Sequence, residues 1–151
     1  MQAVAQPTYI SISKSQLQIE PEEILRLLGE QGASQDVHTL DLLEKYIEES
    51  LLTCSPQGAF VLKKAQTAPG TGSIHIPGTS FQTGRVIEKM LKKAEYYAFF
   101  LVTVGPAVES MARSLISQGH YLEGYIVDLA ASALVDQATD LLQEQVKDVA
   151  K

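Results

Sequence analysis

The chain has 151 residues, enough for one domain that buries about two-thirds of the surface exposed by its unfolded form. Its 12 Lys and Arg residues against 18 Asp and Glu residues give a formal net charge of −6. No basic run is longer than Lys63-Lys64 or Lys92-Lys93, so the composition disfavours nucleic-acid partners and an electrostatic membrane anchor. One cysteine, Cys54, excludes an internal disulfide, and the first residues lack the pattern of a signal peptide. These features predict a protein of the reducing cytoplasm.

Residues 1–7 show no periodicity and are expected to be a flexible tail, with a single α+β domain over residues 8–151. Tyr9–Ser13 and Leu17–Ile19 alternate apolar and polar residues, which predicts a short strand or a hairpin. Pro21, followed by two acids, predicts a helix that ends at Gly29. A second helix is expected from about Gln35 to Thr53.

The middle of the chain predicts short strands and one helix. Ala59–Leu62 has the composition of a strand, and Ile74–Ile76 alternates so that both isoleucines face a core and His75 faces away. Gly70-Thr71-Gly72 has neither the third glycine of a dinucleotide loop nor the lysine of a phosphate loop, so we interpret it as a turn between strands. A helix is expected over Gly84–Lys93, with a packing face formed by Val86, Ile87, Met90 and Leu91.

The last third of the chain carries the strongest patterns. Tyr96–Val104 is rich in aromatic and β-branched residues, which predicts an interior strand. Pro106 then begins a helix that Gly119 ends. A longer helix is expected over Tyr121–Val149. The expected fold is a mixed or antiparallel sheet packed with helices, and the low polarity of this long helix predicts that it is the central one. Its expected packing residues are Ile126, Leu129, Ala133 and Leu142.

Few residues indicate chemistry. The histidines, His38, His75 and His120, lie far apart in the sequence and show no metal-ligand spacing, so we expect neither a metal site nor a catalytic residue. Cys54 has no basic neighbour or partner motif and is interpreted as a packing cysteine.

Two features remain as candidates for binding. The turn Thr103-Val104-Gly105 joins a strand to a helix, where backbone N–H groups of the first helical turn can receive a polar ligand, although it can equally be a tight turn and nothing more. Asp128 is the only charged side chain between Glu123 and Asp136. It is explained either by a partner in a site or by a solvated stripe formed with Ser132, Asp136, Asp140 and Gln143. That stripe can also form the wall of a cleft.

Three stretches, Ile74–Gly84, Ala98–Gly105 and Gly119–Ala133, together resemble the activation domain of cobalamin-dependent methionine synthase in a short, stand-alone form. The resemblance implies an α+β domain that binds S-adenosylmethionine beside a cobalamin domain. Such a domain supports reductive remethylation of cobalamin that has been oxidised to the inactive cob(II) form. The pair Thr103-x-Gly105 and Asp128 carry most of the likeness, and with Tyr125 they are the expected ligand-binding residues.

One motif of that family has no counterpart among these 151 residues. The missing sequence is Arg-x-x-x-Gly-Tyr, which contributes to holding S-adenosylmethionine, and Gly124-Tyr125 precedes Asp128 and lacks the arginine. Two functions therefore stay open: an activation-like module, incomplete for S-adenosylmethionine, or a non-catalytic binding or scaffold protein. In both, the expected partner is a corrinoid-binding protein or another methionine synthase module, which would supply the cobalamin, and the chain is accessory to a methyltransferase.

Overall fold

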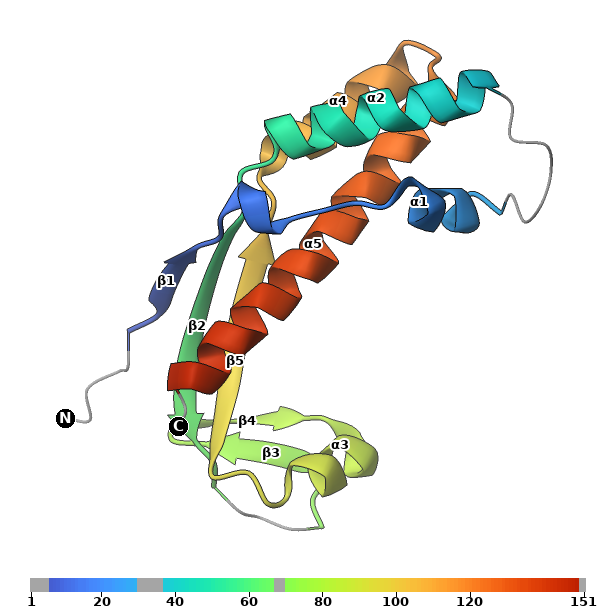
Figure 1. Cartoon of the computed structure of the whole chain (residues 1–151). Helices are drawn as coiled ribbons and strands as arrows, with labels where there is room; N and C mark the ends of the chain where they lie inside the picture. The colour runs from blue at the N-terminus through green and yellow to red at the C-terminus, as the bar shows by residue number, and fades with distance from the viewer. Residues whose placement is uncertain (1–5, 30–36, 67–69, 150–151) are drawn as a thin grey trace. The chain divides into compact units, whose positions relative to one another are not determined.

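The computed structural model describes residues 6–29, 37–66 and 70–149 (Figure 1). It is an α+β fold with antiparallel sheets and a long C-terminal helix, which confirms the predicted fold class. Strands β1, β2 and β5 form one sheet in that order, and β3 and β4 form a separate pair. The elements are β1 (Thr8–Ser11), a 3-10 helix (Lys14–Gln16), α1 (Pro21–Leu27), α2 (Val37–Thr53), β2 (Gln57–Lys64), β3 (Ser73–Ile76), β4 (Thr79–Gln82), α3 (Gly84–Leu91), β5 (Tyr96–Thr103), α4 (Pro106–Ser117) and α5 (Tyr121–Val149).

Internal contacts divide the chain into two compact units. One, here called the strand unit, consists of Met1–Thr8 and Ala59–Leu101. The other, here called the helical unit, consists of Tyr9–Gly58 and Val102–Lys151.

Helix α5 is the axis of the helical unit, because α1, α2 and α4 all contact it. Its 29 residues agree in both bounds with the sequence prediction. The helical spacing of apolar residues places one face in the core, where Ile126, Leu134 and Leu142 are fully buried. Burial of each such side chain stabilises the fold by about 1.5–3 kcal/mol. Of the expected packing residues, Leu129 alone is only half-buried.

Helices α4 and α5 approach most closely at Gly124, which is buried. A Cβ atom at this position would lie 2.5 Å from Cγ1 of Ile116 and 3.0 Å from the backbone oxygen of Ala112. Only the hydrogen of glycine fits between the helices, so Gly124 sets their separation.

In the strand unit, β3 and β4 form an antiparallel hairpin whose register pairs Ser73 with Gln82 and Ile76 with Thr79. Ile74 and Ile76 are buried and His75 is half-buried, as the alternation predicts. The ring centroids of Phe81 and Phe99 are 5.3 Å apart, so β4 and β5 also share an aromatic contact. Strand β4 was not predicted, because all four of its residues are exposed and show no apolar alternation.

Of the two forms expected for the first part of the chain, the short strand is confirmed by β1. The hairpin is not formed: a 3-10 helix precedes Leu17–Ile19, and Leu17 and Ile19 are buried from an irregular segment. Two other sequence predictions are wrong. Strand β5 lies at an edge of its sheet instead of in the interior, and Leu101 is 79% exposed. The apolar face expected on α3 is also largely exposed, with Val86 73% and Met90 77% accessible. In β5 and α3, the apolar composition predicted buried side chains, but the other described residues leave many of these side chains exposed.

Candidate functional site

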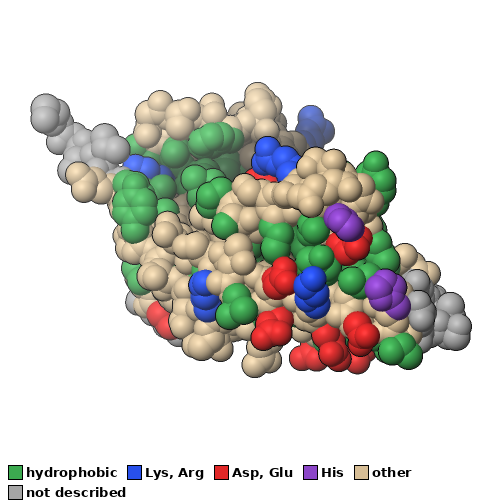
Figure 2. All heavy atoms as spheres, turned by 90° about the horizontal axis from the view of Figure 1, so that it is seen from above, with side chains coloured by type: hydrophobic (Ala, Val, Ile, Leu, Met, Phe, Trp, Pro, Cys, Tyr) green, Lys and Arg blue, Asp and Glu red, His purple; other side chains and the backbone are tan. Residues whose placement is uncertain are grey.

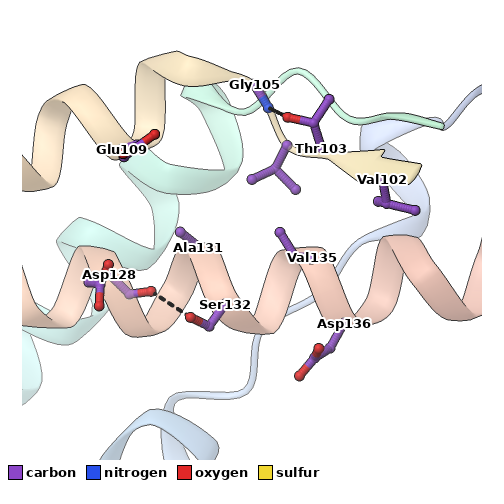
Figure 3. Close-up of a pocket in the computed structure, with 10 residues that line it drawn as sticks. Val102, Thr103, Gly105, Glu109, Asp128, Ala131, Ser132, Val135 and Asp136 are labelled. Carbon is purple, nitrogen blue, oxygen red and sulfur yellow. Dashed lines mark hydrogen bonds between the residues drawn. The ribbon is translucent and has the colours of Figure 1, made fainter. Parts of the chain in front are cut away.

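A cavity of about 400 Å³ opens in the helical unit where β5 ends, α4 begins and α5 passes alongside (Figure 3). Its lining residues are Val102, Thr103, Val104, Gly105, Glu109, Asp128, Ala131, Ser132, Val135 and Asp136. Figure 3 shows Ala131 and Val135 pointing from α5 toward the turn between β5 and α4. The cavity therefore has an apolar floor, with hydroxyl and carboxyl groups around it.

The turn between β5 and α4 depends on Gly105. Its dihedral angles, φ 86° and ψ 159°, lie in a region that is essentially restricted to glycine. The N–H of Gly105 donates to Oγ1 of Thr103 at 3.0 Å, and Pro106, the next residue, has no N–H. Neither Gly105 nor Pro106 therefore offers a free backbone donor, because one N–H is occupied and the other does not exist, and the prediction rests on the residues of the first turn of α4 that follow Pro106.

The segment that follows α2 fixes this turn from the other side. The N–H of Ser55 donates to the backbone oxygen of Val104 at 2.7 Å. A Cβ atom on Gly105 would lie 3.1 Å from Cβ of Ser55. The turn is therefore packed as well as hydrogen-bonded, which keeps Thr103 in place at the edge of the cavity.

One side of α5 supplies the polar wall of the cavity. Asp128, Ser132 and Asp136 line it, and all three are exposed, as are Asp140 and Gln143 farther along the helix. Oγ of Ser132 donates to the backbone oxygen of Asp128 at 3.1 Å. Asp128 therefore belongs to a solvated stripe, and the first three residues of that stripe also wall a cavity.

The polar side chains of the cavity are mostly hydrogen-bond acceptors. Glu109, Asp128 and Asp136 contribute three carboxylates, and no Lys, Arg or His lines the cavity among the described residues. Glu109 pairs with Arg113 one turn along α4, whereas no partner is present for the Asp128 carboxylate in the described ranges. An acceptor-rich rim above an apolar floor suits a ligand that carries positive charge or several N–H and O–H donors.

The structure brings together three of the four predicted site residues. Thr103, Gly105 and Asp128 line one cavity, whereas Tyr125 is 47% exposed and does not line it. Sequence reasoning did not select Glu109 or Val135. Helical spacing could have found Val135, because residues 128, 131, 132 and 135 share one face of α5. Glu109 lines the cavity only because α4 packs against α5, which helical spacing does not reveal.

Cys54 is fully buried, and its thiol donates to the backbone oxygen of Leu51 at 3.2 Å. Burial raises the pKa of this thiol, which opposes formation of a reactive thiolate. These features agree with a packing role. Within the described ranges, no group of three or more His, Cys, Asp or Glu side chains is arranged to hold a metal ion, and no helix is long and apolar enough to cross a membrane.

Comparison with known proteins decides the fold. No family model matches the sequence, and no match was found among curated proteins. A solved structure described as the MetH reactivation domain bound to AdoHcy matches with a TM-score of 0.64 and covers 96% of this chain. The chain has the fold of the MetH reactivation domain. Because sequence identity is 15%, the likeness establishes the fold alone, and the chain spans 56% of the length of that neighbour.

Proposed function

We propose that this protein is a reactivation module of the methionine synthase type, which associates with a cobalamin-binding protein and assists reductive remethylation of its cobalamin with S-adenosylmethionine. The observation that carries the proposal is the reactivation-domain fold over 96% of the chain. In this role the protein is accessory to a cytoplasmic cobalamin-dependent methyltransferase, and the corrinoid reaches it only through the partner.

The cavity between α4 and α5 is the proposed ligand site. The solved neighbour is described as bound to AdoHcy, the product that S-adenosylmethionine leaves after methyl transfer. S-adenosylmethionine carries a sulfonium and an ammonium group, which suit the carboxylates of Glu109, Asp128 and Asp136. Ala131 and Val135 supply an apolar surface for the uncharged part of such a ligand. Within the cavity, Asp128 is the proposed acceptor for an amine or hydroxyl group.

A second candidate function is a binding or scaffold protein of a corrinoid methyltransferase system that does not itself hold S-adenosylmethionine. It is favoured by one observation, the absence of an Arg-x-x-x-Gly-Tyr sequence from these 151 residues. Loss of a bidentate contact between arginine and a carboxylate weakens binding considerably, and a deficit of about 2.8 kcal/mol is a hundredfold in affinity. The isolated chain should therefore bind S-adenosylmethionine weakly or not at all, and micromolar binding would exclude this second candidate.

A calorimetric titration tests both candidates. The chain is titrated with S-adenosylmethionine and with S-adenosylhomocysteine, each in the presence and absence of a corrinoid protein in its cob(II) state. The reactivation module predicts that the corrinoid protein binds the chain and that S-adenosylmethionine binds more tightly to the complex than to the chain alone. The scaffold predicts association with the corrinoid protein and no heat from either nucleoside.

A spectroscopic assay distinguishes assistance from association. With a chemical reductant and S-adenosylmethionine present, the reactivation module should increase the rate at which the cob(II) absorbance is replaced by that of methylcobalamin. The Asp128→Asn variant, which keeps the side-chain shape and removes the charge, should reduce that increase. If the chain does not associate with any corrinoid protein tested, the proposed function is wrong in both forms.

A further inference from the structure

The strand unit is basic although the chain as a whole is acidic. Its basic side chains are Lys63, Lys64, Arg85, Lys89, Lys92 and Lys93, and its acidic side chains are Glu88 and Glu95. The acidic residues of the chain are concentrated in the helical unit. Figure 2 shows several Asp and Glu side chains close together on one face of the molecule. The net charge of the whole sequence therefore conceals a positively charged part.

Three of these cations gather along α3 and at the residue that follows it. Arg85, Lys89 and Lys92 recur at helical spacing and line a cavity of about 370 Å³ together with Gly70 and Glu88. None of the three cations forms a salt bridge within the ranges that the structure describes. Three like charges around one hollow are only partly offset by the single carboxylate of Glu88.

The loop that contributes Gly70 to this cavity is shaped to hold an anion. The N–H groups of Gly70 and Gly72 both donate to the carboxylate of Glu88, the second at 2.8 Å. Both glycines have positive φ, 88° and 69°, in the left-handed region that glycine adopts readily. Backbone N–H groups that converge in this way form an anion-binding concavity, here occupied by a side chain of the protein itself.

Glu88 behaves as the resident anion of this concavity. Hydrogen bonds from Gly70 and then Gly72 lower the pKa of Glu88, and the charges of Arg85 and His75 act in the same direction. The loop amides and the nearby cations thus stabilise negative charge at one place. A tetrahedral anion with two negative charges would satisfy the same donors and offset more of the surrounding positive charge than a carboxylate does.

We propose that the cavity formed by Gly70, Arg85, Lys89 and Lys92 binds the phosphate group of a small-molecule ligand, and that Glu88 occupies the loop amides when the ligand is absent. Arg85 offers a planar pair of donors for phosphate oxygens, and the two lysines add point charges. Glu88 is a competitor, because its carboxylate must leave the amides of Gly70 and Gly72 before phosphate reaches them. The site lies within the strand unit and does not depend on the function proposed for the helical unit.

The test uses the full chain labelled with ¹⁵N and titrated with inorganic pyrophosphate at constant ionic strength. The amide resonances of Gly70 and Gly72 should shift in a saturable manner. Glu88→Gln keeps an acceptor oxygen for the loop and removes the competing charge, so it should bind pyrophosphate about tenfold more tightly. Its thermal melt and amide spectrum report whether the fold is retained.

A matched pair of variants separates a site from general attraction. The double variant Lys89→Gln with Lys92→Gln should lose at least about tenfold in affinity. The control, Lys45→Gln with Lys147→Gln, removes the same charge from the helical unit and should leave the affinity close to that of the parent chain. If both pairs weaken binding equally, the attraction is non-specific and the proposal is wrong.

Two further outcomes would overturn the proposal. One is a titration in which the Gly70 and Gly72 amides do not move, and the other is a folded Glu88→Gln variant with unchanged affinity. In either case Glu88 only fastens α3 to the loop. A parallel titration with ADP identifies the source of the phosphate: tighter binding than pyrophosphate indicates a nucleotide, and equal or weaker binding indicates that phosphate alone is recognised.

Discussion

Replacement of Gly124 by alanine tests the packing of α4 against α5 that encloses the candidate site. The added Cβ would lie 2.5 Å from Cγ1 of Ile116 and 3.0 Å from the backbone oxygen of Ala112. The first contact is shorter than Cβ atoms tolerate, and the second involves backbone, which moves only if the helix moves. The side chain of Ile116 must therefore move away, and the backbone of α4 must also shift slightly from α5.

The magnitude follows from two opposing effects. Overpacking of a well-packed interface costs about 1–3 kcal/mol. Alanine in place of glycine inside a helix stabilises it by about 1 kcal/mol, since glycine loses more backbone freedom on folding. The net expectation is a loss of about 1 kcal/mol in the free energy of unfolding, which corresponds to a fall in melting temperature of about 2–4 °C for a chain of this length.

Urea denaturation followed by circular dichroism measures this loss. The companion variant is Ile116→Ala, which removes the atom that is closest to the added Cβ. In that background Gly124→Ala should cost less, because only the longer contacts with the backbone of Ala112 and Ile116, at 3.0 and 3.2 Å, remain. A Gly124→Ala variant as stable as the parent chain, or more stable, would show that α4 and α5 are not held at the separation described.

Four further outcomes are expected. Ala133→Leu places a larger side chain at a position that is 6% exposed, and should lower the free energy of unfolding by about 1–3 kcal/mol in a urea melt. Gly105→Ala should cost about 1–3 kcal/mol in the same assay, because its φ of 86° strains any other residue. Hydrogen bonds lower the pKa of Glu88 below its ordinary value of 4.5, so their stabilisation is present above that value and lost as pH falls through the lowered pKa. Melting temperatures measured between about pH 5 and pH 3 should therefore fall more steeply for the parent chain than for Glu88→Gln. Asp128→Asn should leave the melting temperature unchanged, since Asp128 is exposed, and should weaken association with ligand or corrinoid partner; unchanged affinity would reduce Asp128 to a solvated residue.

The candidate site was partly visible in the sequence. Thr103, Gly105 and Asp128 were selected from a turn signal, from an isolated charge and from the family resemblance, and they line one cavity. Tyr125 was selected with them and lies outside that cavity, because it is about one turn before Asp128 along α5, beyond the end of the run from Asp128 to Asp136 that lines the cavity. Glu109 lines the cavity because α4 packs against α5, and the periodicity of each helix does not show that the two helices meet.

The sequence by itself determined the helices of the helical unit. Pro21, Pro106, Gly29 and Gly119 mark helix ends because proline presets φ and glycine adopts positive φ, and both effects act within a few residues. The predicted bounds of α5, Tyr121–Val149, agree with the structure for the same local reason: a long apolar stripe at helical spacing.

Only the tertiary structure decided where exposed and buried surfaces lie and which distant groups meet. Strand β4 exists because Thr79–Gln82 pairs with Ser73–Ile76. Strand β5 is exposed because it lies at a sheet edge. The composition of β4 does not reveal its pairing, and the composition of β5 does not reveal its position at the edge. The contact of Glu88 with the amides of Gly70 and Gly72 likewise joins a helix to a loop 16 or more residues away. Such contacts depend on how elements pack in space, whereas sequence patterns report only the periodicity of each element.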